Sequence, residues 1–202
     1  MLNKCYILTS YFQNQTADFF KTIRDSGALL ICADGGQNIA KKWSIMPSII
    51  IGDFDSSDSR EIRHITYPKE KDITDTEACI IYAIKEGYTD ITLLGGLGGR
   101  VDHTLGNLAL LAKYDVMLVD NQNIVQCIKD KTITIKADDH TYVSVVTFGE
   151  ANSFVTMKGV KFPLNNYELP YDSTLGISNV ITSGAAEITV KGTALIVQSK
   201  DL

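Results

Sequence analysis

The stretch PSIIIGDFDSSDS, residues 47–59, places two carboxylates directly after a run of apolar residues. Asp53 and Asp55 are two positions apart. Two like charges about 4 Å apart repel each other by about 1 kcal/mol in water and by about 4 kcal/mol near a protein surface. Something must therefore compensate for this repulsion, and the chemistry that could do so depends on which other groups lie nearby.

Further acids follow other apolar runs. Asp34 comes after ALLICA, and Asp75 falls in the first turn of a predicted helix. The carboxyl ends of parallel strands meet at one edge of a sheet, where ligands bind in open α/β folds. Carboxylate oxygens are ligands that Mg²⁺ prefers. Taken singly, each aspartate is best explained as a turn or cap residue, but together the four favour a magnesium site at this edge.

The segment LLGGLGGRVDHTLGN, residues 93–107, contains four glycines between a predicted strand and a predicted helix. Such a turn lets backbone amides approach a phosphate at a helix N-terminus, and Arg100 adds a bidentate phosphate donor. The segment matches neither the Walker A pattern nor G-x-G-x-x-G. The alternatives are a tight connection and a surface ion pair between Arg100 and Asp102. Lys71 could neutralise a triphosphate, and we interpret His103 as structural.

The first half of the chain alternates short β-rich runs with helical patterns, which predicts a mostly parallel sheet covered by helices. The expected strands are CYILTS, ALLICADG, PSIIIGDFD, DITLLGG and VMLVD. The expected helices are TADFFKTIRDSG, with Thr16 as N-cap, then GGQNIAKKW, SDSREIRHI, TDTEACIIYAIKEGY, and residues 101–114. Thr74 and Glu77 form a capping-box pattern in the fourth helix.

Beyond Asp120 the pattern changes to short alternating strands separated by Gly, Asn, Asp and Pro. The expected strands are TITIK, TYVSVVTFG, NSFVTMKG, ITSGAAEITVKG and TALIVQSK. This spacing predicts an antiparallel β-sandwich. The fold class is therefore α/β plus all-β. With a connection between Asn121 and Asp130, the expected domains are residues 1–122 and 123–202.

Composition excludes several classes of protein. The 202 residues are 45% hydrophobic and carry a net charge of −5, which argues against a basic nucleic-acid-binding surface. Apolar runs are too short for a membrane span or a signal peptide, so we expect a cytoplasmic protein without membrane or nucleic-acid partners. The four cysteines are widely spaced, without a CxxC pair, which favours buried thiols over a metal site or disulfides.

Five motifs together resemble the thiamine pyrophosphokinase family, in order and along nearly the whole chain. They are CADGG at residues 32–36, GDFDS at 52–56, KDITDTEA at 71–78, GGLGGRVDHTLGN at 95–107 and GISN at 176–179. The resemblance implies a catalytic α/β domain that binds ATP and Mg²⁺, and a β-sandwich that helps bind thiamine. It also implies a homodimer with its sites at the subunit interface, and transfer of a diphosphate from ATP to thiamine.

The resemblance also implies roles for individual residues. The acids that handle Mg²⁺ and nucleotide phosphates would be Asp34, Asp53, Asp55 and Asp75, with the metal on the last three. The nucleotide site would add Gly35, Gly36, Lys71, Asp72, Thr74, Gly98, Gly99 and Arg100. Catalysis would rest on Asp53, Asp55, Asp75, Arg100 and Asp102. Acceptor binding would involve Asp102, Asn107, Ser178 and Asn179.

The chain departs from the family pattern at two positions, where Val180 replaces a common acidic residue and Phe162 a larger aromatic one. Three other readings use some of the same residues. IIIGDFDSS also resembles the start of haloacid-dehalogenase-type phosphatases, in which Asp53 would be the nucleophile. A non-catalytic nucleotide sensor and a pyrophosphokinase for a different alcohol, such as a pterin, are the others.

Overall fold

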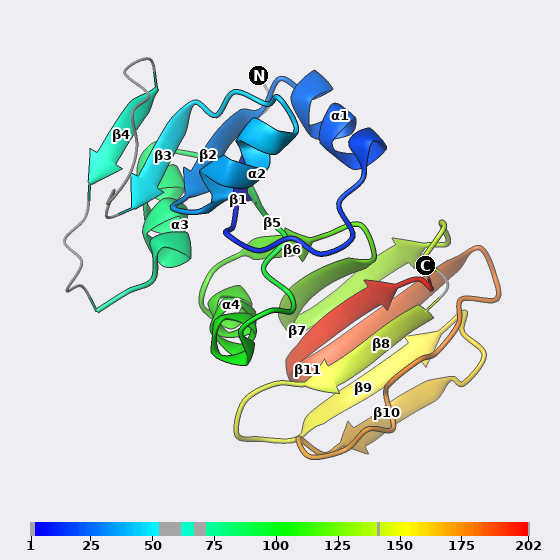
Figure 1. Ribbon diagram of the computed structural model, residues 1–202. Coiled ribbons are helices and arrows are strands. Elements are labelled where there is room, and N and C mark those ends of the chain that lie inside the picture. Colours follow the sequence, from blue (N-terminus) through cyan, green and yellow to red (C-terminus); the bar gives the residue numbers. More distant parts are fainter. Residues whose placement is uncertain (1–2, 53–61, 67–71, 141, 202) are drawn as a thin grey trace. The chain divides into compact units, whose positions relative to one another are not determined.

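The computed structural model describes residues 3–52, 62–66, 72–140 and 142–201 (Figure 1). The chain forms two compact units, residues 1–121 and 122–202. Three residues of the expected site, Asp53, Asp55 and Lys71, lie outside the described residues. No helix in the described ranges is long and apolar enough to cross a membrane.

The first unit is built on a parallel sheet whose neighbouring strands follow the order β6-β5-β1-β2-β3-β4. Because the chain runs outward from β1 to β4 and then returns to β5 beside β1, the strand order reverses between β1 and β5. This reversal is the topological switch point of the sheet. The strands are β1 (Lys4–Leu8), β2 (Leu29–Ala33), β3 (Ile49–Gly52), β4 (Arg63–Thr66), β5 (Asp90–Leu94) and β6 (Val116–Val119).

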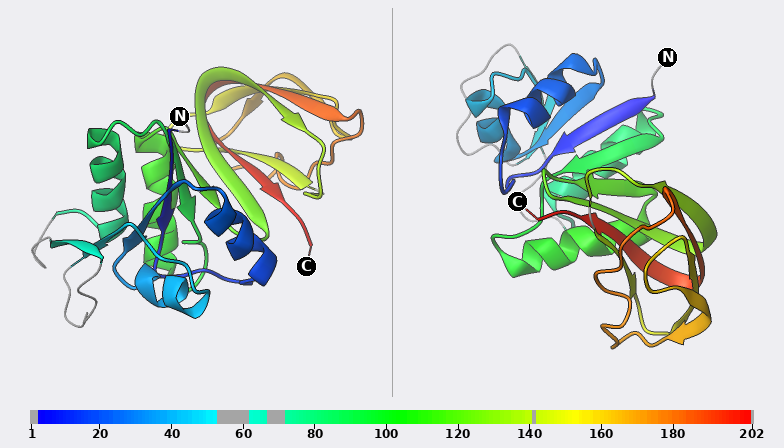
Figure 2. Two further views of the ribbon diagram at one scale, coloured as in Figure 1. Left: turned by 90° about the horizontal axis from the view of Figure 1, so that it is seen from above. Right: turned by 90° about the vertical axis from the view of Figure 1, so that its right-hand side faces the viewer.

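Helices cover both faces of this sheet (Figures 1 and 2). On one face, Phe20 and Ile23 of α1 and Ile39 of α2 pack with Leu8 and Leu30 in a buried apolar cluster. The helices are α1 (Ala17–Asp25), α2 (Gly36–Lys42), α3 (Asp75–Lys85) and α4 (Val101–Lys113). Four of the five expected helices are therefore present, and Thr16 and Thr74 cap α1 and α3 as their sequences predict.

The expected helix SDSREIRHI is wrong in its described part, because residues 63–66 form strand β4. This strand pairs in parallel with β3 at the edge of the sheet. Its charged residues resemble a helix surface in the sequence, but an edge strand also tolerates charges. Arg63 donates a hydrogen bond from Nη1 to the Tyr82 hydroxyl of α3 at 3.2 Å, which fixes it on that helix.

The second unit is antiparallel and is organised around one long strand. β11 pairs with β7 along nearly its whole length, with β9 at residues 187–191 and with β8 at residues 194–199. The sheet thus branches at Gly192, where φ is 108° and the register shifts. Apolar side chains of β7, β8, β9 and β11 meet in one buried core. The strands are β7 (Asn123–Lys136), β8 (Tyr142–Thr147), β9 (Ser153–Lys158), β10 (Leu164–Leu169) and β11 (Ala185–Ser199).

The fold class is confirmed, since mostly parallel strands with helices are followed by antiparallel strands. Two details of the second half differ from the expectation. The connection expected between Asn121 and Asp130 is mostly the first half of β7, and TITIK is its continuation. The last two expected strands are one strand, β11, because Gly192 allows a bend and a bulge without ending the pairing.

Candidate functional site

A cavity of about 360 Å³ opens at the switch point of the parallel sheet. Its walls come from the carboxyl ends of β1, β2 and β5 and from the first turns of α3 and α4. This is the place at which an open α/β sheet binds its ligands. The lining residues are Thr9, Ser10, Tyr11, Asp34, Thr76, Gly96, Gly98, Arg100, His103 and Asn107.

Asp34 is held firmly in the wall of this cavity. It directly follows β2 in a left-handed conformation with φ of 38°, which aspartate tolerates better than most residues. Its N–H donates to the carbonyl of Ile51 at 2.8 Å. A Cβ placed on Gly52 would lie 3.1 Å from the Asp34 Cβ, so the end of β3 passes directly against this residue. Gly52 is the residue before Asp53.

Gly35 and Gly36 allow the turn after β2 to pack closely on the end of β1. A Cβ on Gly36 would lie 2.2 Å from the carbonyl oxygen of Leu8, a distance that excludes any side chain. A Cβ on Gly35 would lie 3.1 Å from the Ser10 Cβ. These two glycines of the expected nucleotide site therefore bring Asp34 beside the residues that follow β1.

In the glycine loop, residues 95–99, three backbone N–H groups donate hydrogen bonds to other groups of the protein. The N–H of Gly95 donates to Val119, that of Gly96 to Tyr11 and that of Gly98 to the Thr104 hydroxyl. Its four glycines all have positive φ values, between 66° and 86°. The loop thus reaches the cavity in a fixed shape, and these three amides are not available to cradle a phosphate without rearrangement.

Asn107 supports the same loop from α4. Its side chain is 7% exposed, and Nδ2 donates to the carbonyl of Gly96 at 2.9 Å. A Cβ on Gly96 would lie only 2.6 Å from that nitrogen. The acceptor contact expected for Asn107 stays a prediction, while its observed bond holds the glycine loop.

Arg100 and Asp102 form an ion pair at the start of α4. Arg100 donates from Nε at 3.1 Å and from Nη2 at 2.5 Å to the two carboxylate oxygens of Asp102. Hydrogen bonds from Arg100, and in smaller part from the His103 N–H at 3.0 Å, together lower the pKa of Asp102 to about 2. The same pair raises the pKa of Arg100. Both side chains are exposed, so the pair can open towards a ligand.

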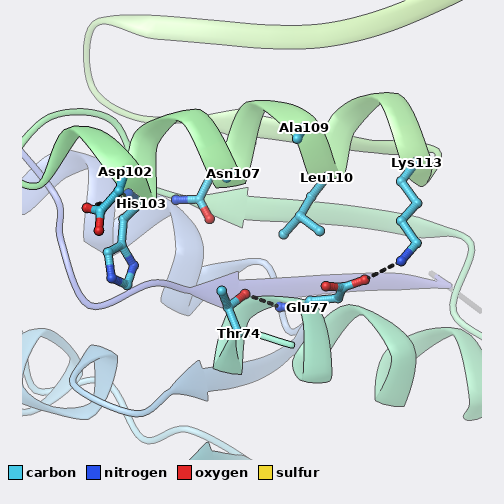
Figure 3. A pocket seen from close by; sticks show the side chains of 9 residues that line it. Thr74, Glu77, Asp102, His103, Asn107, Ala109, Leu110 and Lys113 are labelled. Atoms are coloured by element: carbon cyan, nitrogen blue, oxygen red, sulfur yellow. Dashed lines mark hydrogen bonds and ion pairs between the residues drawn. The ribbon is translucent and has the colours of Figure 1, made fainter. Parts of the chain in front are cut away.

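A second cavity, of about 380 Å³, lies between α3 and α4 and shares His103 and Asn107 with the first (Figure 3). At one end Thr74 caps α3, with its hydroxyl accepting from the Glu77 N–H at 3.2 Å. At the other end the Glu77 carboxylate accepts from Lys113 at 2.6 Å and from Tyr114 at 2.8 Å. Burial raises the pKa of Glu77, but these two hydrogen bonds outweigh it and leave the pKa lowered.

The two remaining described acids of the expected site lie at the start of α3. Asp75 is its first residue and is half-buried, and Asp72 is exposed just before it. Neither lines the two cavities, although Thr74 and Thr76 do. The metal and nucleotide roles expected for Asp72 and Asp75 stay predictions.

Sequence reasoning missed the wall formed after β1, which consists of Thr9, Ser10 and Tyr11. It also treated His103 as structural, whereas this residue lines both cavities. The rule that located Asp34 could have found the first three, because they end or directly follow the predicted strand CYILTS at the same edge of the sheet.

In the second unit, the GISN motif alternates between the interior and the surface, with Gly176 and Asn179 buried and the two residues between them exposed. Asn179 is 5% exposed and joins two backbone segments. Its Oδ1 accepts from the Phe162 N–H at 3.0 Å, its Nδ2 donates to the Phe162 carbonyl at 2.7 Å, and its backbone pairs with Val143. Ser178 is exposed with φ of 60°, and its N–H donates to the Ser144 hydroxyl.

Comparison with known families accounts for both units. Residues 20–126 match the model described as "Thiamin pyrophosphokinase, catalytic domain", and residues 130–197 match "Thiamin pyrophosphokinase, vitamin B1 binding domain". The chain belongs to the thiamine pyrophosphokinase family. The thiamine pyrophosphokinase of Bacillus subtilis is 34% identical to it over 192 residues, which cover 88% of this chain and 90% of the relative.

Solved structures agree with this family membership. A crystal structure of thiamine pyrophosphokinase from Bacillus subtilis is similar with a TM-score of 0.87 and 27% identity, covering 98% of this chain and 100% of the other. That of thiamin pyrophosphokinase from Geobacillus thermodenitrificans has the same TM-score and identity, with 98% of each chain covered. The catalytic-domain match begins at residue 20, so the wall at Thr9–Tyr11 lies before it.

Proposed function

We propose that this chain is a thiamine diphosphokinase, which transfers the diphosphate of ATP to the hydroxyl of thiamine and releases AMP. The observation that carries the proposal is the cavity at the switch point, where Asp34, Arg100 and the glycine loop meet in a chain of this family. The proposed domain roles follow, with residues 1–122 acting on ATP and residues 123–202 recognising thiamine.

The donor set of the first unit fits Mg²⁺. Asp34 lies in the cavity wall against Gly52, the residue that precedes Asp53, and Asp75 begins α3 at the same edge. Carboxylate oxygens are hard ligands that suit this ion. We propose that Asp53, Asp55 and Asp75 hold it, with Asp34 beside the phosphates. When bound, the ion supplies charge shielding for the transferred diphosphate.

We propose that Arg100, which lines the cavity, binds the phosphates of the nucleotide. Phosphoryl-type transfer depends mainly on positioning and on electrostatic stabilisation, and a guanidinium can bind two phosphate oxygens at once. Lys71, Asp72, Thr74, Gly98 and Gly99 complete the proposed nucleotide site. Because Arg100 is already paired with Asp102, a bound phosphate competes with that carboxylate for the guanidinium.

Asp102 is better suited to orientation than to proton removal. A carboxylate with a pKa of about 2 is fully ionised at neutral pH and is a weak base there. We therefore propose that Asp102 orients Arg100 and accepts a hydrogen bond from the acceptor hydroxyl, with Asn107 keeping the adjacent loop in place.

For the second unit, we propose that the GISN motif supports thiamine recognition. Ser178 is exposed and can offer its hydroxyl to the acceptor. Asn179 acts indirectly, because its amide group is hydrogen-bonded to the backbone of Phe162, a residue that is 59% exposed. The acidic residue common after this motif is replaced by Val180, whose N–H donates to the Asn179 Oδ1.

We also propose a cytoplasmic homodimer with its sites at the subunit interface. Val101 and Leu105 of α4, beside the two cavities, are 71% and 61% exposed, which supports a partner surface there. The chain mass is 22.2 kDa, so light scattering should give about twice this value. A mass near that of the monomer would exclude the dimer.

The test of the function is product analysis by mass spectrometry, after incubation of the purified protein with thiamine, ATP and Mg²⁺ and with each component omitted. We expect thiamine diphosphate and AMP in equal amounts. ADP with thiamine monophosphate would indicate single-phosphoryl transfer. Phosphate release with a phosphoenzyme at Asp53 would indicate a phosphatase, and nucleotide binding without turnover would indicate a sensor or a different acceptor.

A further inference from the structure

We infer that Tyr11 is a positioning residue that fixes the glycine loop, residues 95–99, and through it Arg100. The inference rests on the proposed function, because the loop is taken as part of the nucleotide site. It concerns a residue outside the family-matched range and outside the motifs that the sequence singled out.

The backbone of Tyr11 joins the two strand ends at the switch point. Its carbonyl oxygen accepts from the Gly96 N–H at 2.6 Å and from the Thr9 hydroxyl at 3.0 Å. The same Thr9 hydroxyl lies 3.0 Å from the Leu94 carbonyl, and the Thr9 N–H donates to that carbonyl at 3.1 Å. The segment after β1 and the loop after β5 are therefore hydrogen-bonded to each other at two points, Leu94 and Gly96.

The ring of Tyr11 lies directly against the second half of the loop. A Cβ on Gly99 would come within 2.9 Å of the ring carbon Cδ2, and one on Gly98 within 3.0 Å of Cε1. Real Cβ atoms essentially never come within 2.9 Å of another atom, and 3.0 Å is tighter than nine in ten of their contacts, so a side chain at either position would force the ring or the loop to shift. The Tyr11 ring thus favours glycine at positions 98 and 99, in addition to the preference set by their positive φ values.

Tyr11 is itself anchored by the residues that follow it. Phe12 is 4% exposed and packs against Phe19 and Phe20, with ring centroids 5.0 and 5.2 Å away. Gln15 donates from Nε2 to the Phe12 carbonyl and accepts from the Trp43 indole at 2.8 Å. A ring mounted on such a rigid segment transmits its position to whatever packs on it.

The consequence for the cavity follows from the order of the chain. Arg100 directly follows Gly99, so a shift of the loop moves its guanidinium relative to Asp34, which lines the same cavity. Removal of the Tyr11 ring leaves a space into which the loop can relax. Small displacements of groups that hold a substrate cost large factors in binding and rate.

The test compares Tyr11→Phe, Tyr11→Leu and Tyr11→Ala with wild type. The probe is α,β-methylene-ATP with Mg²⁺, in which the linkage between the α- and β-phosphates cannot be cleaved. Its affinity for each protein is measured by calorimetry. We expect Tyr11→Ala to weaken binding by about tenfold or more and Tyr11→Phe by less than about twofold, because Phe keeps the ring. Tyr11→Leu, which retains most of the volume, should fall between them and serves if the Ala variant does not fold.

A double-variant comparison separates positioning from general stability. Gly99→Ala should weaken nucleotide binding strongly in wild type but less in the Tyr11→Ala background, where the Cβ has room. Tyr88→Ala, which removes a half-buried ring near the opposite end of β5, is the control and should leave binding unchanged. In steady-state kinetics of Tyr11→Ala, the KM for ATP should rise while the KM for thiamine stays constant.

The outcomes distinguish this inference from the proposed function. A wild-type protein that binds the nucleotide but makes no thiamine diphosphate would overturn the function, while the Tyr11 variants still decide the inference by binding. Equal binding by wild type and Tyr11→Ala, or an equal cost of Gly99→Ala in both backgrounds, would overturn the inference. Absence of nucleotide binding by the wild type would overturn both.

Discussion

The polar side chains of the two units differ in where they lie and in what they contact. In the parallel unit, Asp34, Arg100 and His103 follow strands or begin helices at one edge, and all three line a cavity. In the antiparallel unit, Thr147, Ser153 and Asn179 are buried, and their side chains bond to backbone groups of other segments. Polar side chains converge on an open space in the first unit and connect segments in the second.

The difference follows from sheet geometry. Parallel strands all end at the same edge, so residues that follow them gather there and can act on one ligand. Antiparallel strands end alternately at both edges, so their loops are dispersed. Polar side chains there are used to hydrogen-bond one segment to another. A polar motif in the second unit is therefore weaker evidence of ligand contact than one at a strand end of the first, and GISN illustrates this.

The largest effect should come from removing the charge of Asp34. Asn has the same shape as Asp and also tolerates the left-handed backbone found there, so Asp34→Asn should fold normally. Loss of a carboxylate at the phosphate site should lower kcat by about 100-fold or more. The measurement is thiamine diphosphate formation at saturating ATP across a range of Mg²⁺ concentrations.

Asp18→Asn is the matched control, since Asp18 is exposed in the first turn of α1, away from the cavity walls. It should retain wild-type turnover. If Asp34→Asn also retained it, with the same Mg²⁺ dependence, the cavity at the parallel edge would not be the reaction site and the contrast between the units would fail.

In the antiparallel unit, the expected effect of a motif substitution is on stability. Asn179→Ala leaves the N–H and the carbonyl of Phe162 without their partners in a part-buried place. Such losses cost about 2–4 kcal/mol in the free energy of unfolding. Urea denaturation followed by circular dichroism measures it, and Asn165→Ala, at an exposed position of β10, should change the value by less than about 0.5 kcal/mol.

The kinetic behaviour of the same variant decides between two roles. If Asn179 acts only by holding the Phe162 segment, Asn179→Ala should lose thiamine affinity only through movement of that segment. The single variant Phe162→Ala and the double variant Asn179→Ala/Phe162→Ala should then have the same thiamine affinity. Normal stability combined with a raised KM for thiamine would instead support direct contact with the acceptor, which the family resemblance implied.

Strand ends are readable from apolar runs, and this rule predicted which residues gather at the edge of the sheet, while their roles in the site stay predictions. Asp34 and Arg100 were found in this way, and the caps Thr16 and Thr74 were predicted by local hydrogen-bonding chemistry. The same rule extended to β1 would have included Tyr11. Its contact with Gly98 and Gly99 was not predictable, because the sequence does not show that β1 and β5 are neighbours.

The misassigned elements have a common physical cause. SDSREIRHI carries charges at a helix-like spacing, but in its described part pairing with β3 overrides this local preference. Gly192 interrupts the pattern of β11 although the strand continues through a bulge. The burial of Asn179 likewise depends on Phe162, seventeen residues away in the chain, a tertiary contact that no local pattern encodes.

The smallest expected effect concerns the ionisation of Asp102, which can be followed by carbon NMR of labelled aspartate. Its pKa of about 2 should rise towards the ordinary value of 3.8 in Arg100→Gln, and stop short of it because the His103 N–H still donates to the carboxylate. Arg24→Gln, which removes a distant surface arginine, should leave it unchanged.

The sign of this shift determines what the pH profile can contain. A pKa that is lower in the folded protein than in the unfolded chain favours folding above pH 3.8, and this contribution is lost as the pH falls through about 2. Asp102 therefore stays ionised throughout the neutral range, and any inflection of kcat between pH 5 and 9 must come from another group. A pKa near 3.8 in the wild type would show that the ion pair is open in solution. Arg100 would then meet the phosphates without competition, and the site at the parallel edge would be set by Asp34 and the glycine loop alone.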